Sequence, residues 1–255
     1  MFYEDLSPKK KQIVRRFLHR ADLVLALSDG WKQQLETIFG LTNCRALPNG
    51  IDTEELENGR CEIHADTAHS FAFLGRMGQR KGAYDLVDAV QRAAQVDPSI
   101  RVLMAGDGEV EEIRKKVRED GVEQQISVHG WVDFAGKCAL LRQSATVVLP
   151  SYHEGLPMTI LEGMASGKAI ISKTVGAIPE VVRPENGILV APGDVNALAD
   201  ALLRCAQDTQ MLRRMSTANR GKIDQMFSMR KMHERLAEYY EEAMDRKDRH
   251  GEVSG

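Results

Sequence analysis

The strongest constraint on the fold of this chain is the regular alternation, from Phe71 onward, of short β-rich runs with longer amphipathic segments. This alternation is typical of βαβ units, in which helices cover both faces of a buried parallel sheet. Because such crossovers are right-handed, they predict an α/β fold with a doubly wound, Rossmann-like parallel sheet. The predicted strands are 71–74, 101–105, 127–130, 146–150, 169–172 and 187–190, and the predicted helices are 82–95, 109–119, 133–143, 157–166 and 178–182.

The ligand crevice of a doubly wound sheet lies beyond the carboxyl ends of its strands. Four loops occupy this position in the predicted fold, at Gly75, Gly106, Gly130 and Ser151. We therefore expect a binding site to be assembled from these loops.

The flanking segments predict a different organisation. Residues 1–50 contain a basic helix over 7–20, a strand over 23–27, a helix from Ser28 and Asp29, and a strand over 45–47. Two buried-type strands cannot satisfy their edges alone, so this segment is interpreted as the last βαβ elements of an N-terminal domain. Residues 51–225 are the main predicted domain, 226–244 a C-terminal helix, and the polar residues 245–255 a disordered tail.

Composition restricts the class of partner. The 255 residues are 43% hydrophobic and carry a net charge of −3, which allows a full core and argues against nucleic acid as the main partner. No apolar run approaches the roughly 20 residues needed to cross a bilayer, and no signal peptide is evident. We expect a cytoplasmic protein that binds a small molecule, with reduced thiols at Cys44, Cys61, Cys138 and Cys205.

The most informative motif is the segment from Ser151 to Lys168, SYHEGLPMTILEGMASGK. A predicted strand ends before it, and Pro157 stands where the first turn of a helix tolerates a missing N–H. The amides around residues 156–159 and the positive end of this helix predict an anion site that fits a diphosphate. Glu154 and Glu162 flank that site, where carboxylates are favourable only if they accept hydrogen bonds from hydroxyls, as both sugars of a nucleotide-sugar provide.

This segment resembles the Glu, seven residues, Glu signature of glycosyltransferase family 4 (group 1), whose members are retaining enzymes with the two-domain GT-B fold. The resemblance covers about residues 45–200 and implies that the chain is mainly the C-terminal, donor-binding half of that fold. It implies that Glu154 contacts the transferred hexose and Glu162 the ribose of the nucleotide. The segment implied to hold the β-phosphate comprises Gly155, Leu156, Pro157, Met158 and Thr159.

A second motif, FLGRMGQRKG at residues 73–82, follows the first strand of the main predicted domain. Its glycines let the backbone approach a ligand, while Arg76 offers a planar fork and Lys81 a point charge for phosphate oxygens. It resembles the Gly-Arg…Lys-Gly element of the same family, which implies that Gly75, Arg76 and Lys81 bind the donor. Arg76, Lys81 and Glu154 are the residues predicted to act in catalysis, although a basic glycine loop taken alone is often solvated surface.

The loop Gly130-Trp131-Val132 follows the third predicted strand. By the resemblance it supplies backbone contacts to the base, with Trp131 as a wall of the pocket; the alternative is a tryptophan that simply packs. The glycine spacings fit neither a dinucleotide-binding loop nor a P-loop. No Asp-x-Asp occurs, so neither a metal nor another cofactor is expected.

The predicted N-terminal helix is amphipathic, with apolar residues at 13, 14, 17 and 18. It is consistent with peripheral contact to an anionic membrane at the inner face, or with a solvated helix packed on its own domain. Its basic residues are Lys9, Lys10, Lys11, Arg15, Arg16 and Arg20.

The resemblance implies a hexosyltransferase that uses a nucleoside-diphosphate sugar and a saccharide or lipid-linked acceptor. A non-catalytic nucleotide-sugar-binding module, a truncated fragment, and a nucleotide-sugar epimerase of the same fold are the alternatives. A complete member of the family has an acceptor domain before these residues, so either the chain is a fragment of a longer protein or a separate N-terminal domain complements it. We expect the chain alone to transfer little sugar, because nothing orients the acceptor.

Overall fold

The computed structural model describes residues 6–56 and 63–252, which form two compact units. One unit contains the chain up to Gly50 together with the helix from Arg230 onward, and the other runs from Ile51 to Met229. The two ends of the second unit, at residue 51 and at residues 227–229, are hydrogen-bonded to each other. The N–H of Ile51 donates to the carbonyl of Phe227 at 2.7 Å, and the N–H of Met229 donates to the carbonyl of Ile51 at 2.9 Å.

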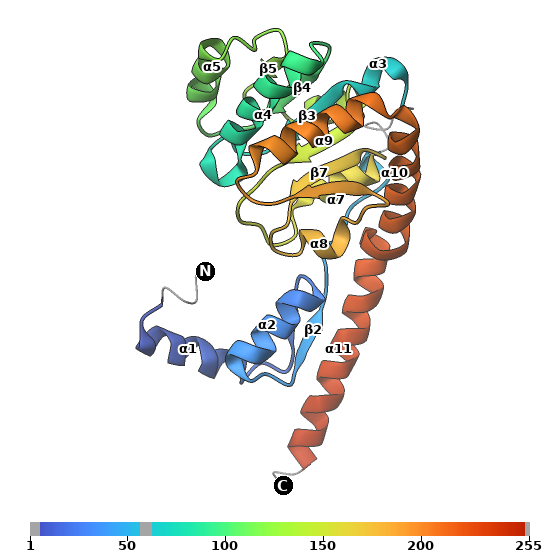
Figure 1. The fold of residues 1–255 in the computed structure, drawn as a ribbon. Helices are drawn as coiled ribbons and strands as arrows, with labels where there is room; N and C mark the ends of the chain where they lie inside the picture. The colour runs from blue at the N-terminus through green and yellow to red at the C-terminus, as the bar shows by residue number, and fades with distance from the viewer. Residues whose placement is uncertain (1–5, 57–62, 253–255) are drawn as a thin grey trace. The chain divides into compact units, whose positions relative to one another are not determined.

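The second unit is built on a six-stranded parallel sheet in the order β5-β4-β3-β6-β7-β8 (Figure 1). This order confirms the predicted doubly wound, Rossmann-like sheet, because the chain starts in the middle, moves to one edge, and then returns to build the other half. The strands are β3 Ser70–Leu74, β4 Arg101–Ala105, β5 Ile126–Val128, β6 Thr146–Leu149, β7 Ala169–Lys173 and β8 Gly187–Val190.

Helices cover both faces of this sheet, as right-handed crossovers require. On one face of the sheet, α4 packs along α9. Helix α7 packs against strands β6 and β7 and against α10. Strands β6 and β7 are buried along their whole length, so the core of the unit lies around the middle of the sheet. The helices are α4 Ala83–Val96, α5 Val110–Glu119, α6 Phe134–Arg142, α7 Met158–Ala165, α8 Ile178–Val181, α9 Val195–Gln207 and α10 Thr209–Lys222.

The predicted and observed elements differ mainly at their ends. Strand β6 stops at Leu149 rather than at residue 150, because Pro150 has no N–H to donate to a ladder. Strand β5 is shifted toward Ile126, although the N–H of His129 still donates to the carbonyl of Met104 at 2.8 Å. Three short elements have no counterpart in the predicted pattern: α3 Ala65–Ala68, the 3₁₀ turn η2 Gln79–Lys81, and the π-helical turn η3 Ile223–Phe227.

The first unit contains a parallel pair of strands between two helices and the C-terminal helix. Its N-terminal elements are α1 Pro8–Leu18, β1 Val24–Ala26, α2 Asp29–Phe39 and β2 Cys44–Ala46. Helix α2 begins where predicted, since the Ser28 hydroxyl accepts from the N–H of Trp31 at 3.2 Å. The small core of this unit contains Val24, Phe39, Leu41 and Cys44.

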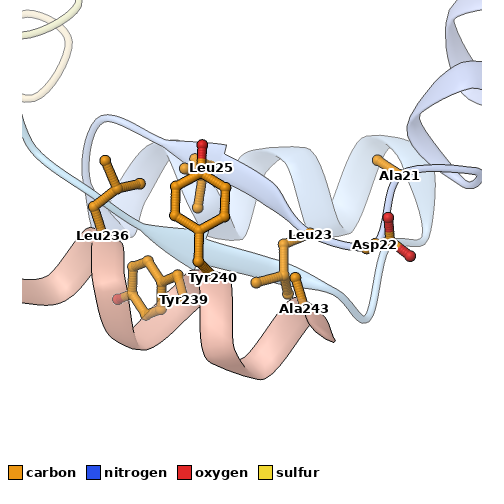
Figure 2. A pocket seen from close by; sticks show the side chains of 8 residues that line it. All are labelled: Ala21, Asp22, Leu23, Leu25, Leu236, Tyr239, Tyr240 and Ala243. Atoms are coloured by element: carbon orange, nitrogen blue, oxygen red, sulfur yellow. The ribbon is translucent and has the colours of Figure 1, made fainter. Parts of the chain in front are cut away.

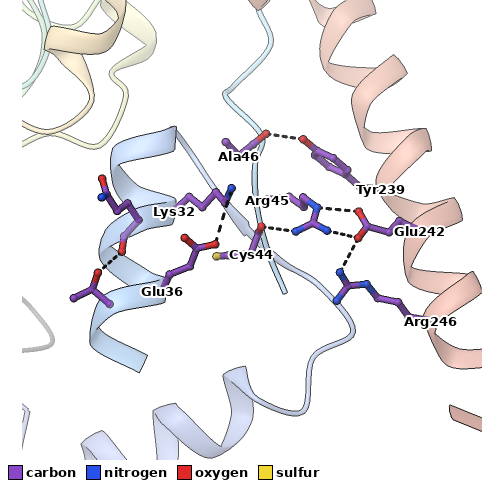
Figure 3. A network of polar contacts seen from close by, with 10 residues as sticks. Lys32, Glu36, Cys44, Arg45, Ala46, Tyr239, Glu242 and Arg246 are labelled. Atoms are coloured by element: carbon purple, nitrogen blue, oxygen red, sulfur yellow. Dashed lines mark hydrogen bonds and ion pairs between the residues drawn. The ribbon is translucent and has the colours of Figure 1, made fainter. Parts of the chain in front are cut away.

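Helix α11 Met229–Glu252 faces the two strands of this unit. It leaves a hollow of about 350 Å³ against the start of β1, with Leu25 on one side and Leu236 and Tyr240 on the other (Figure 2). The hydroxyl of Tyr239 donates to the carbonyl of Ala46 at 3.0 Å, and Arg45 forms a bidentate ion pair with Glu242 (Figure 3). These bonds from Arg45 lower the pKa of Glu242.

The C-terminal segment differs from its prediction. In place of a helix over 226–244 and a disordered tail over 245–255, one helix continues to Glu252, and residues 253–255 lie outside the described part of the chain. Arg246 donates to Glu242 at 2.8 Å, one turn earlier on the same helix. Arg246 is therefore part of a helix rather than of an unstructured tail.

The cysteines that the structure describes have free thiols, as the sequence predicted. Cys44, Cys138 and Cys205 are buried, and burial raises the pKa of each. Cys61 lies outside the described residues. Within the described ranges, no helix is both long enough and apolar enough to cross a membrane.

Candidate functional site

The candidate site lies at the carboxyl ends of β3 and β6, the two neighbouring strands from which the sheet extends in opposite directions. Ligands of doubly wound sheets bind at this switch point, because the loops of the two strands diverge there. The loop after β3 carries Lys81, and the loop after β6 carries Glu154. The Nζ atom of Lys81 donates to Oε1 of Glu154 at 2.6 Å, with side chains only 18% and 8% exposed. The structure thus brings two predicted site residues into direct contact.

The two loops meet because one glycine permits it. Gly82 has a φ of 70°, and a Cβ atom there would lie 2.0 Å from the carbonyl oxygen of Pro150. A side chain is therefore excluded both by the left-handed backbone and by the neighbouring loop. The N–H of Tyr152 also donates to the carbonyl of Arg80 at 2.9 Å. These backbone contacts bring together Lys81, which precedes Gly82, and Glu154, which comes two residues after Tyr152.

Helix α7 begins beside Glu154, one residue later than predicted. Pro157 is the N-cap and Met158 the first helical residue, so the missing N–H of the proline lies just outside the helix. The hydroxyl of Thr159 donates to the carbonyl of Leu74 at 3.0 Å, which fixes the first turn of the helix to the end of β3. The N–H of Ile160 donates to the carbonyl of Pro157 at 3.1 Å, whereas the N–H groups of Met158 and Thr159 have no preceding helical carbonyl to bond, as an anion site requires.

The loop before α7 is also fixed from the other side. The N–H of Ala177 donates to the carbonyl of Gly155 at 2.9 Å, and Gly176 comes so close to Glu154 that a Cβ atom would lie 2.0 Å from its carbonyl oxygen. The side chain of Leu156 is buried, whereas that of Met158 is 39% exposed. The predicted phosphate-binding segment is therefore a rigid turn between β3, β6 and β7.

Glu162, in the second turn of α7, is paired with a residue that the sequence did not single out. Nζ of Lys137 in α6 donates to Oε1 of Glu162 at 2.6 Å, and the same ammonium lies 5.7 Å from the centre of the Phe134 ring. The two side chains are 26% and 14% exposed. No sequence signal distinguished Lys137 from the other lysines, because its importance depends on how α6 packs beside α7.

Arg76 lies at the same edge of the sheet but in a different ion pair. Its Nη1 atom donates to Oδ2 of Asp107, in the loop after β4, at 3.1 Å, with side chains 66% and 58% exposed. Met77 and Gly108 form an isolated parallel bridge that holds the two loops together. The Arg76 side chain is thus mostly exposed and can rotate away from Asp107 toward a ligand. In the structure it does not contact Lys81 or Glu154.

The loop after β5 also reaches this edge. The N–H of Gly106 donates to the carbonyl of Gly130 at 3.1 Å, and Val132 is half-buried. Trp131 is 74% exposed, so it does not simply pack in the core of its unit. Its role as a pocket wall stays a prediction.

Other possible sites carry none of the predicted residues. The hollow of Figure 2 lies in the first unit, and a second hollow of about 310 Å³ lies near Arg183 and Met215. Among the described residues, no group of three or more His, Cys, Asp or Glu side chains is arranged to hold a metal ion.

Comparison with known proteins places the chain in a family. Residues 68–208, more than half of the chain, match the family described as glycosyl transferases group 1. The chain belongs to the group 1 glycosyltransferases. The fold agrees, since the structural neighbours of the chain are GT-B glycosyltransferases and its six-stranded parallel sheet is that of a Rossmann-like half.

Several glycosyltransferases resemble most of the chain. The glycogen synthase of Mycobacterium tuberculosis is 24% identical over 239 residues, which cover 92% of this chain and 58% of that protein. The phosphatidyl-myo-inositol mannosyltransferase of Mycobacterium leprae is 31% identical over 161 residues, covering 62% of this chain and 42% of that protein. The Anabaena protein HepE, solved in complex with UDP, has a TM-score of 0.81 at 21% identity and covers 93% of this chain and 69% of its own. The chain thus spans about half the length of these curated glycosyltransferases.

The burial of the Lys81–Glu154 pair predicts a large coupling between its two members. Lys81→Met leaves a buried carboxylate unpaired and should lower the free energy of unfolding by about 3 kcal/mol, whereas Lys81→Met combined with Glu154→Gln should recover part of that loss. Urea unfolding of the parent, both single variants and the double variant measures the coupling.

The Arg76–Asp107 pair is the matched control, because it lies at the same sheet edge and is mostly exposed. Arg76→Met and Asp107→Asn should show a coupling of about 1 kcal/mol or less. A coupling for Lys81 and Glu154 no larger than this would contradict the observed pairing.

Proposed function

We propose that this chain binds a nucleoside-diphosphate sugar at the carboxyl ends of β3 and β6, and that the whole protein transfers the hexosyl group to an acceptor hydroxyl with net retention. The observation that carries the proposal is the Lys81–Glu154 pair at 2.6 Å beside the start of α7, where the sheet changes direction. Membership in the group 1 glycosyltransferases supports it. The UDP bound in the HepE structure supports a nucleotide as ligand of this fold.

The diphosphate would bind between the loop after β3 and the first turn of α7. Lys81 supplies a charge there, the segment Gly155–Thr159 supplies backbone N–H groups, and Arg76 can turn from Asp107 toward the phosphate oxygens. Since the Arg76 pair is solvent-exposed, breaking it costs little.

The pairing of Lys81 explains how Glu154 can lie next to an anionic ligand. Two negative groups repel each other in a partly buried site unless a cation lies between them. The ammonium of Lys81 can bond the carboxylate of Glu154 and a phosphate oxygen together, while the remaining oxygen of Glu154 accepts from hexose hydroxyls. We assign Glu162 to the ribose hydroxyls in the same way, with Lys137 as its neighbouring cation.

The reaction breaks the bond between the anomeric carbon and the β-phosphate oxygen, and forms a bond from that carbon to the acceptor oxygen. The proton of the acceptor hydroxyl passes to the departing phosphate oxygen. Negative charge develops on the leaving diphosphate. Lys81, Arg76 and the amides of α7 would stabilise this charge more strongly in the transition state than in the bound substrate. The groups are in place before reaction, so little reorganisation is needed.

The chain is expected to bind UDP-glucose or GDP-mannose in the presence of EDTA, because lysine, arginine and helix amides, rather than a metal, are assigned to the diphosphate. Isothermal titration calorimetry in EDTA and in Mg²⁺ should give the same Kd within about threefold, a difference of about 0.7 kcal/mol. An affinity that disappears in EDTA would overturn the metal-free assignment, and no binding of either ligand would overturn the proposed function.

Substitution of the two glutamates should affect the binding of two ligands differently. Glu162→Ala should weaken binding of the bare nucleoside diphosphate and of the nucleotide-sugar alike, whereas Glu154→Ala should weaken only the nucleotide-sugar. A hydrogen bond to a charged group contributes about 1.5–3 kcal/mol, so each loss should be roughly ten- to a hundredfold in Kd. Bare nucleotide should bind Glu154→Ala as well as the parent or better, because Lys81 is then released from its carboxylate partner.

Thermal unfolding checks first that neither glutamate variant damages the fold. Equal losses for both ligands in Glu154→Ala, or unchanged binding of bare nucleotide by Glu162→Ala, would show that the roles are assigned wrongly even within the right family.

We further propose that α1 contacts an anionic membrane, which would bring the protein to a lipid-linked acceptor. Val14 and Leu18 face the core of the first unit, whereas Ile13 and Phe17 are 55% and 72% exposed. The exposed residues Lys9 and Arg16 lie on the same side of the helical wheel as this apolar pair, and Arg20 follows just after the end of the helix. The M. leprae relative is named for a phosphatidyl-myo-inositol acceptor, which supports a lipid.

Co-sedimentation with vesicles tests this contact. The chain should bind vesicles rich in phosphatidylglycerol, and Ile13→Ser with Phe17→Ser should reduce binding about a hundredfold, since each of the two apolar side chains contributes about 1.5 kcal/mol when buried. Val96→Ser is the control, because Val96 is 66% exposed on α4 of the other unit. Equal binding to pure phosphatidylcholine, or no effect of the double variant, would reject the contact.

A further inference from the structure

A buried charge next to the candidate site has no role in the function proposed above. Lys173, the last residue of β7, is fully buried, and its Nζ atom donates to Oδ2 of Asp85 at 2.6 Å. The hydroxyl of Tyr152 donates to the same carboxylate oxygen at 2.6 Å. The ammonium of Lys173 also lies 3.6 Å from the centre of the Tyr152 ring. The three side chains form a closed network between β7, the first turn of α4 and the loop after β6.

Packing alone does not explain this network. Burying an ammonium group is costly unless it is paired, and an apolar side chain of similar volume would fill the same space without that cost. Here each polar group is satisfied within the network: the carboxylate accepts from two donors, and the ammonium has both a carboxylate and an aromatic face. The bond to Asp85 raises the pKa of Tyr152 to about 12, so its hydroxyl remains a donor throughout the neutral pH range.

The network is attached to both partners of the central ion pair through the backbone. Tyr152 precedes Glu154 by two residues, and its N–H donates to the carbonyl of Arg80, which is adjacent to Lys81. Asp85 lies three residues after Gly82, where the two loops touch. Movement of the Tyr152 side chain would therefore displace the loops that carry Lys81 and Glu154.

We propose that Lys173, Asp85 and Tyr152 are positioning residues that hold the loops after β3 and β6 in register, so that Lys81 and Glu154 meet and the sugar of the donor is gripped. The ligand part of this proposal rests on the proposed function. The part that concerns the ion pair does not, since it is a property of the free protein.

The first test repeats the Lys81–Glu154 cycle in a Tyr152→Phe background. This change removes one oxygen and keeps the ring beneath the ammonium. The coupling between Lys81→Met and Glu154→Gln, expressed as a factor in the folding equilibrium constant, should fall roughly tenfold, which is the effect of one charge-assisted hydrogen bond. A purely structural role would lower the stability of every variant equally and leave the coupling unchanged.

The second test compares UDP-glucose with UDP, or GDP-mannose with GDP if the parent prefers guanosine. Tyr152→Phe should raise the Kd of the nucleotide-sugar roughly tenfold and that of the bare nucleotide less than about threefold, since Glu154 shares the loop of Tyr152, whereas the diphosphate keeps Arg76 and the amides of α7 even if Lys81 shifts. Lys173→Met should show the same difference. If Lys173→Met does not fold, the Tyr152→Phe measurements decide the proposal alone.

Two matched controls involve polar contacts of the same helix as Asp85: Tyr84 lies on α4, and Lys116 on α5 pairs with Asp88 of α4. The hydroxyl of Tyr84 donates to Glu109 at 2.6 Å, and Lys116 pairs with Asp88 at 2.6 Å, but neither is bonded to the loop after β6. Tyr84→Phe and Lys116→Met should therefore leave both the coupling and the ligand ratio unchanged. The proposal is overturned if Tyr152→Phe leaves the coupling intact, or if Tyr84→Phe lowers it equally. Failure of the parent to bind nucleotide-sugar would instead overturn the proposed function and leave the first test in force.

Discussion

The contact between the backbone of Gly82 and the carbonyl of Pro150 is the constraint on which the candidate site depends. A Cβ atom at residue 82 would lie 2.0 Å from that oxygen, so a residue with a side chain would force the loops after β3 and β6 apart. Lys81 and Glu154 are immediate neighbours of this contact, and their 2.6 Å bond is possible only because the loops touch. The chemistry of the site therefore rests on the absence of one side chain, and the ion pair is a consequence of backbone geometry rather than its cause.

The general position of the site could be predicted from the sequence because it follows from local patterns and one rule of handedness. The apolar runs at Arg101–Ala105 and Gly187–Val190 are bounded by clear turn signals, and the observed strands have those bounds. Once the strands alternate with crossover helices, they run parallel, so all their carboxyl ends lie at one edge of the sheet. The loops after β3 and β6 had to share an edge of the sheet, although their sequences are about 70 residues apart.

The partners of the site residues could not be predicted, because they depend on how helices pack in three dimensions. Lys137 and Lys173 look in the sequence like any other lysine, and Asp85 like an ordinary residue of a first helical turn. Lys137 reaches Glu162 only through the packing of α6 beside α7, and Lys173 reaches Asp85 across 88 residues. For the same reason, the sequence predicted that Arg76 and Lys81 both bind the diphosphate and did not distinguish them. In the structure Arg76 pairs with Asp107 in an exposed ion pair, whereas Lys81 pairs with Glu154 in a mostly buried one.

The three lysine–carboxylate pairs around this edge differ in burial, and the difference indicates which of them a ligand can rearrange. Lys173 is 1% exposed, Lys81 18% and Lys137 26%. Separating the Lys173 pair would leave a buried ammonium with only the face of the Tyr152 ring, so that pair must persist whether or not a ligand is bound. Lys81 and Lys137 retain access to solvent and can exchange part of their bonding with a carboxylate for bonding with an incoming phosphate or hydroxyl. The buried Lys173 pair is thus suited to fixing the loops, and the partly exposed pairs of Lys81 and Lys137 are suited to binding a ligand. In the free protein each of these lysines neutralises the charge of its carboxylate partner.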